Sequence, residues 1–362
     1  MPRPLAAPPL AARLAALALA AAIPARAQEG MKNQPPATAP ATVSDRVREV
    51  PALDAAATAA LRPGTVLFAD RRDKGSASPE SGLIKFDDWR AQRPAEAAAL
   101  MPFPGYVEPE YQQTINGVTK PRHETLKVYV AQGRFVVAKP PASVDLAAYA
   151  RLDFVAKMDP VIKHRRIDPS EATPTKDPAA AFARRPDRPW CQAPGATCIE
   201  SRYALEGKLP LGVRLANKLE LGATKKVAEF VSFQSELRPL SAAEAATLGA
   251  LTKIDTAPVG GLEQTIFWVN QILRFGTFVA VAQPAPDDPN RTIVTTFLAL
   301  AVKADVLDRK QDYARVPVLK NLLPVQVLMG NSSFNTGTSI SAGLPVYAKN
   351  RIAAFADALS KT

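Results

Sequence analysis

The chain has 362 residues, of which 47% are hydrophobic, and a formal net charge of +11 at neutral pH. This content is ample for a packed core, so one large domain or two ordinary ones fit the length and a disordered chain is excluded. The positive charge bears on solubility and on encounter with anionic surfaces rather than on a specific function, because no block of five or more like charges occurs.

The N-terminus has the pattern of a secretion signal. Arg3 and Arg13 precede an apolar run over residues 14–23, and the small residues of 24–27 supply a cleavage pattern. We therefore expect residues 1–27 to be a signal peptide. An uncleaved anchor is disfavoured because the run is about half of the roughly 20 residues that span a bilayer.

A signal peptide implies a periplasmic or secreted protein that is soluble after export. We expect no nucleic-acid partner in that compartment, and we consider an anionic membrane surface as a partner of the basic chain. Residues 28–63 are rich in Ala and Pro at first and are predicted to form a flexible tether. Residues 64–362 are then expected to form a single domain.

The first half of this domain alternates short strands and short helices. A Gln132-Gly133 dipeptide between apolar runs predicts a hairpin turn. The other elements follow from alternation, helical spacing and capping residues. They are an edge strand over 65–70, a helix from Asp87 or Asp88 that is interrupted at Pro94, a short helix from Ser143 to Arg151, and a further strand over 152–158.

Six prolines between residues 159 and 190 exclude a long helix or a central strand there. We expect an exposed basic excursion of about thirty residues, longer than ordinary loops. Its clusters at 163–166 and at Arg184-Arg185 leave two interpretations open. The segment is either disordered and inert, or it contacts anionic lipid.

The chain has two cysteines, Cys191 and Cys198, separated by a Pro194-Gly195 turn. An oxidising compartment and the absence of a third thiol predict a disulfide between them. A metal site is disfavoured because the chain has only two histidines, and a redox-active pair usually has two intervening residues rather than six.

The second half of the domain carries the longest apolar runs. Residues 277–283 and 292–302 are apolar on both faces, and a short turn between them indicates antiparallel pairing. Both faces therefore need cover by helices, a second sheet or an apolar ligand. Three helices are expected in this half: an amphipathic one over 211–219, one that begins at Ser241, and a C-terminal one with an inner stripe of Ile352, Phe355, Ala356 and Leu359 and with Lys and Arg facing outward.

These elements predict an α+β domain. Its centre is a curved antiparallel sheet of about six to eight strands, packed by the C-terminal helix and by one or two further helices, such as the one near Leu211.

A polar loop over residues 330–339 is the main candidate binding site. Its hydroxyl and amide groups suit a phosphate, a carboxylate or a sugar, although the same residue types form ordinary turns. Trp268 fits either a core or a ligand-lining wall, and the amide of Asn270 needs hydrogen-bond partners if it is buried. The candidate ligand-binding residues are Asn331, Ser332, Ser333, Asn335, Thr336, Ser339, Trp268 and Asn270.

Catalytic signals are weak. Residues 337–343 do not form the Gly-x-Ser-x-Gly elbow of serine hydrolases, and His123 and His164 are interpreted as incidental surface histidines. We predict no catalytic residue, no metal ligand and no cofactor.

The leading hypothesis is an exported, non-catalytic binding or carrier protein for an apolar or amphipathic, lipid-like ligand held between sheet and helices. One alternative is a structural or interaction module of the cell envelope. A second is a hydrolase with an unfamiliar site.

Overall fold

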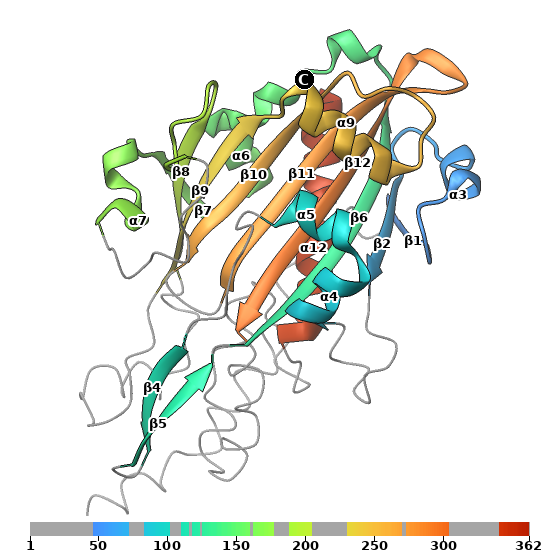
Figure 1. Ribbon diagram of the computed structural model, residues 1–362. Coiled ribbons are helices and arrows are strands. Elements are labelled where there is room, and N and C mark those ends of the chain that lie inside the picture. Colours follow the sequence, from blue (N-terminus) through green and yellow to red (C-terminus); the bar gives the residue numbers. More distant parts are fainter. Residues whose placement is uncertain are drawn as a thin grey trace, which may run out of the picture. The chain divides into compact units, whose positions relative to one another are not determined.

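The protein is built around one large sheet, seen in a computed structural model (Figure 1). The structure describes residues 46–71, 83–101, 110–115, 118–123, 125–159, 162–176, 188–204, 230–269, 273–303 and 340–361. The sheet has ten strands in the order β1-β2-β6-β12-β11-β10-β9-β8-β7, with β3 paired to β6 off this path. The chain is therefore an α+β protein, and its sheet is larger than the predicted six to eight strands.

Antiparallel pairing prevails in the sheet, as predicted, but β1 pairs with β2 in parallel and makes the sheet mixed. Its strands are β1 (Val47–Glu49), β2 (Val66–Arg71), β3 (Ile84–Lys85), β6 (Leu126–Val137), β7 (Ile162–Arg166), β8 (Thr197–Ala204), β9 (Phe230–Pro239), β10 (Gly260–Val269), β11 (Leu273–Ala285) and β12 (Asp288–Lys303). A separate two-stranded sheet pairs β4 (Glu110–Ile115) with β5 (Val118–His123).

Helices cover both faces of the large sheet (Figure 1). One face packs against α12 (Ile340–Lys361), η3 (Leu146–Ala150) and α6 (Leu152–Met158); we call it the α12 face. The other packs against α4 (Phe86–Gln92), α5 (Pro94–Leu100) and α9 (Ala242–Thr252); we call it the α9 face. The remaining helical segments are α3 (Ala55–Ala59), η2 (Pro141–Ser143), η4 (Pro169–Glu171) and α7 (Thr173–Lys176).

The central strands β11 and β12 are buried on both faces, as their sequences predict. Phe278 and Leu298 contribute to the cluster on the α12 face, and Val279 and Phe297 contribute to the cluster on the α9 face. Because side chains alternate along a strand, each strand supplies apolar residues to both clusters. Helices provide the cover that these strands need.

Several predicted helix boundaries are confirmed. Ser241 and Glu244 form a capping box at the start of α9, in which each side chain accepts a hydrogen bond from the other residue's backbone N–H. Pro94 separates α4 from α5 and occupies the first turn of α5, where its missing N–H costs nothing.

The C-terminal helix buries its predicted stripe. Ile352 and Phe355 are fully inaccessible to solvent and face β6 and β11. The prediction that all its basic residues face outward is wrong, because Arg351 is also buried. Arg351 directly precedes Ile352 and lies at the edge of the apolar stripe, so its side chain also faces the sheet.

Three other predictions fail in the first half of the domain. Gln132-Gly133 is not a turn, because β6 continues through it as one strand. Residues 152–158 form helix α6 rather than a strand, since Phe154, Val155 and Met158 lie on one buried helical face. The strand predicted as an edge, β2, lies between β1 and β6.

The predicted excursion contains ordered structure. Residues 162–166 form the outermost strand β7, which pairs with β8, and residues 169–176 form η4 and α7. The prolines fit this arrangement because Pro169 and Pro174 lie in the first turns of these segments and outside the strand.

The described part of the tether range, from residue 46, enters the sheet through β1. Residues 28–45, the predicted signal peptide and the predicted helix over 211–219 lie outside the described residues. Among the helices that the structure describes, none combines the length and hydropathy needed to cross a membrane.

Candidate functional site

Most of the predicted ligand-binding residues fall outside the part of the chain that the structure describes. These are Asn270, Asn331, Ser332, Ser333, Asn335, Thr336 and Ser339. Trp268 is described; it lies in β10, is partly buried and packs against the cluster on the α9 face.

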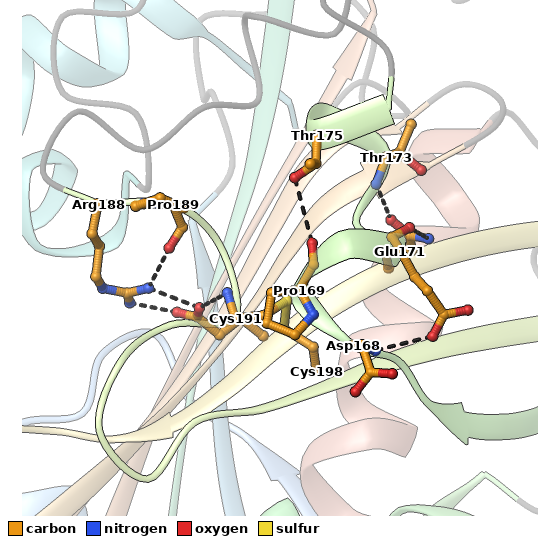
Figure 2. The surroundings of a disulfide bond; sticks show 11 residues. Asp168, Pro169, Glu171, Thr173, Thr175, Arg188, Pro189, Cys191 and Cys198 are labelled. Atoms are coloured by element: carbon orange, nitrogen blue, oxygen red, sulfur yellow. Dashed lines mark hydrogen bonds and ion pairs between the residues drawn. A yellow bond between two sulfur atoms is a disulfide. The ribbon is translucent and has the colours of Figure 1, made fainter.

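Cys191 and Cys198 form a disulfide at the start of β8, as the sequence predicts (Figure 2). Their Cα atoms are 5.5 Å apart, within the usual range for a disulfide. The bond closes the loop that contains Gly195, whose φ of 71° favours glycine. Trp190, beside the bond, stacks on Phe267 with 4.5 Å between ring centroids.

A buried carboxylate on β9 holds this corner to the sheet. Glu236, only 1% exposed, accepts hydrogen bonds from Nη1 and Nη2 of Arg188 at 2.8 and 2.5 Å and from the backbone N–H of Cys191 at 2.6 Å. Two residues away, the side chain of Gln234 accepts a hydrogen bond from the backbone N–H of Thr173 at 2.7 Å. The buried side chains of Glu236 and Gln234 thus have hydrogen-bond partners, and we interpret the corner as a structural anchor.

A second polar cluster lies on the α12 face, between the C-terminal helix and the sheet. We call it the Arg351 cluster; its members are Arg351, Asp159, Tyr149 and Gln264. Arg351 donates from Nη1 to Oδ2 of Asp159 at 2.5 Å. Its Nη2 donates to the hydroxyl of Tyr149 at 2.5 Å and to Oε1 of Gln264 at 2.6 Å. The cluster thus brings charged and neutral polar groups to one guanidinium.

The cluster continues toward β9. The hydroxyl of Tyr149 donates to Oε1 of Gln264 at 2.7 Å, and Nε2 of Gln264 donates to Oγ of Ser235 at 3.1 Å. Ser235 is fully buried in β9. The chain of hydrogen bonds therefore runs from α12 through η3 and β10 to β9.

Each member is positioned by a different element. Arg351 lies on α12 one turn before Phe355, and Gln264 points from β10 toward the helix. Tyr149 lies on η3, where Asp145 accepts a hydrogen bond from the backbone N–H of Ala148 at the helix start. Asp159 is the C-cap residue that directly follows α6.

Aromatic rings surround the cluster. The ring of Tyr149 stacks on Phe278 at 5.7 Å and meets the edge of Phe355 at 5.2 Å. The guanidinium carbon of Arg351 lies 5.8 Å from the centroid of Phe278, within reach of a cation–π interaction. The polar groups are therefore embedded in an aromatic layer.

Burial perturbs the ionisable groups of the cluster. It raises the pKa of Tyr149, and this outweighs the opposing effect of Arg351, so the phenol stays neutral. Burial alone would lower the pKa of Arg351, but Tyr149, Tyr347 and Asp159 together raise it above its ordinary value. The cluster therefore holds a permanent buried cation, which is characteristic of functional sites and also of structural ion pairs.

His164 lies close to this cluster, on the outermost strand β7. It is half-buried, contrary to the prediction of a surface histidine, and its Nδ1 is 2.8 Å from Oγ of Ser201, its partner on β8. Burial lowers the pKa of His164; Asp159 acts in the opposite direction and Arg351 lowers the pKa further. Ser201 is 1% exposed, so the pair is a cross-strand hydrogen bond without access for a substrate.

Sequence reasoning missed Arg351, Asp159, Tyr149 and Gln264. A weak signal was present for Arg351, which adjoins Ile352 and lies four residues before Phe355, at the edge of the buried stripe. Nothing in the sequence relates Asp159 or Gln264 to that helix, because they come from segments far apart in the chain.

Comparisons with known proteins add little. No family model matches the chain, and no curated protein matches it either. Among solved structures, the crystal structure of Ara h 8.0201 aligns with a TM-score of 0.24 and 12% sequence identity, over 51% of this chain and 91% of that chain. A TM-score of this size carries no argument about fold or function.

Proposed function

We propose that this protein is an exported, non-catalytic binding protein for an amphipathic ligand. The apolar part of the ligand packs in the layer between α12 and the sheet, and its polar end is recognised by the Arg351 cluster. The observation that carries the proposal is a buried guanidinium, 7% exposed, inside an otherwise aromatic and aliphatic layer.

The composition of this layer supports the proposal. Binding sites for small molecules are lined mostly by apolar side chains with a few convergent polar groups. Phe278 and Phe355 supply apolar surface beside the guanidinium, and Tyr149 and Gln264 supply a hydroxyl and an amide.

The energetics of burial support it as well. Removing two charges from water costs several kcal/mol per ion, and well-packed apolar residues of similar volume are often as stabilising as a buried ion pair. The Arg351–Asp159 pair is therefore not needed for stability alone, and recognition of a polar group is a sufficient reason for a cation at this position.

Two measurements test the proposal. The full chain, purified without detergent, is extracted with organic solvent and the extract is analysed by mass spectrometry; an amphiphile in near-stoichiometric amount is expected. Titration with a fluorescent amphiphile should then give saturable binding that Arg351→Met weakens. The control is Arg46→Met, which removes an exposed ion pair between Arg46 and Asp357 of α12 and should leave binding unchanged. A ligand-free protein that binds no amphiphile would contradict the proposal.

One observation favours a second candidate, a structural or interaction module of the cell envelope. The rings of Tyr149, Phe154, Phe278 and Phe355 already pack against one another, with centroid distances between 5.2 and 6.3 Å. Side chains of the described residues thus cover this part of the sheet themselves. Reproducible cross-linking to one envelope component, without an extractable ligand, would support this candidate.

A further inference from the structure

The only carboxylate among the described contacts of Arg351 belongs to Asp159, and it is the more accessible partner. The side chain of Asp159 is 21% exposed, against 7% for that of Arg351. Asp159 also lies where α6 ends, so its side chain can rotate into solvent without moving the helix. Arg351 also has neutral acceptors: Tyr149 and Gln264, which are buried and fixed by packing, and Tyr347, which lies one turn earlier on α12.

From this asymmetry we infer that the ligand's polar end is a carboxylate that takes the place of Asp159 at Arg351. This inference rests on the proposed function and names its ligand class, an amphipathic carboxylic acid in its ionised form. The carboxylate of Asp159 then neutralises the guanidinium of Arg351 when no ligand is bound.

Charge balance selects a carboxylate over other heads. A hydroxyl or an ester in place of Asp159 would leave a buried guanidinium without a counter-charge, which is strongly unfavourable. A doubly charged phosphate would put an excess negative charge into an apolar layer. A carboxylate keeps the layer neutral and matches the planar donors of the guanidinium.

His164 can donate a hydrogen bond to the side chain of Asp159 after the ligand displaces it from Arg351. Its Nδ1 contacts Ser201 and its Nε2 is buried, and the backbone of Asp159 forms a further hydrogen bond with the imidazole. In the tautomer with hydrogen on Nε2, Nδ1 accepts from the Ser201 hydroxyl and Nε2 is a donor that an Asp159 carboxylate can use. Asp159 already interacts electrostatically with His164, so this exchange requires a change in side-chain torsion only.

The experiment compares three probes that share a twelve-carbon alkyl chain and differ in their head group: laurate, dodecanol and dodecyl phosphate. Their binding to the full-length protein is measured by titration calorimetry. We expect laurate to bind about tenfold or more tighter than dodecanol, the effect of one charge-assisted hydrogen bond. The decisive variant is Asp159→Asn, which removes the competing carboxylate. It should tighten laurate binding several-fold and leave dodecanol binding unchanged.

Asp153→Asn is the matched control. It lies on α6, which Asp159 follows, and it is exposed; among the described residues it pairs with the surface side chains of Arg151 and Lys157. We expect no change in laurate affinity. Arg351→Gln should abolish the preference for laurate over dodecanol. Circular dichroism verifies the fold of this variant and of Asp159→Asn, because each removes one partner of a buried pair. The comparison of the three probes on the unchanged protein keeps the test decisive if either variant does not fold.

Several outcomes would overturn the carboxylate assignment. Equal affinities for laurate and dodecanol, tighter binding of dodecyl phosphate than of laurate, or no gain from Asp159→Asn would each do so while leaving the proposed binding function in place. Failure of all three probes to bind would overturn the proposed function together with the inference.

Discussion

Gly133 lies directly against Ile352, and a Cβ at Gly133 would come within 2.5 Å of Cγ2 of Ile352 and 2.8 Å of Oγ1 of Thr296. Strand β6 and helix α12 can therefore approach each other only because this position has no side chain. Gly133→Ala should destabilise the protein by about 1–3 kcal/mol through overpacking. Urea denaturation followed by circular dichroism measures this change.

Gly260 offers a matched control for that substitution, because nothing lies within 4 Å of a Cβ built there. Gly260→Ala should change the free energy of unfolding by less than about 1 kcal/mol. If both variants behaved alike, close packing would not be the reason for glycine at position 133.

The anchor at Glu236 predicts a large loss of stability. Glu236→Gln removes the charge that Arg188 pairs with and weakens the hydrogen bond from the Cys191 backbone. Breaking a buried pair by removing one partner costs about 3–5 kcal/mol, with the lower end expected here because Arg188 is partly solvated. Urea denaturation measures this loss, and Glu200→Gln, in the exposed pair with Arg165, should lose less than about 1 kcal/mol.

His164 predicts a pH dependence of stability. Burial lowers its pKa in the folded state below the ordinary value of 6.5, so below that pH the unfolded chain binds a proton that the folded chain does not. The neutral imidazole thus contributes its full stability above pH 6.5, and stability falls as the pH decreases toward the lowered pKa. Free energies of unfolding at pH values from 8 to 5 should show a shallower decline in His164→Gln; an unchanged decline would count against this assignment.

The disulfide should stabilise the folded protein by closing one short loop. Closing the loop between Cys191 and Cys198 contributes about 2–3 kcal/mol on the chain-entropy estimate. A reductant should therefore lower the melting temperature of the protein, and it should have no effect on the double variant Cys191→Ser/Cys198→Ser. A reductant effect of equal size on the double variant would show that it acts elsewhere.

Local patterns predicted much of the fold. The capping box of Ser241 and Glu244, the break at Pro94 and the buried stripe around Ile352 all depend on neighbours within one helical turn. The continuous strand β6 was missed because Gly133 has two uses, as a turn former and as a site of close approach. The second use appears only when α12 is in place.

The candidate site could hardly be predicted. Arg351 comes from the C-terminal helix, Asp159 from the end of α6, Tyr149 from η3 and Gln264 from β10. Their side chains meet only after the sheet has formed. His164 was assigned to a proline-rich excursion, whereas pairing with β8 makes its segment the outermost strand of the sheet.

The amino-acid sequence alone determined that two central strands are apolar on both sides, that the two cysteines pair, and that a helix closes the chain. These properties follow from side-chain periodicity or from a lack of alternatives, so they need no knowledge of distant neighbours. Only the tertiary structure decided which polar side chains are buried between α12 and the sheet. Burial of a charge such as that of Arg351 depends on partners that the fold brings from elsewhere, because an unpaired charge could not remain there.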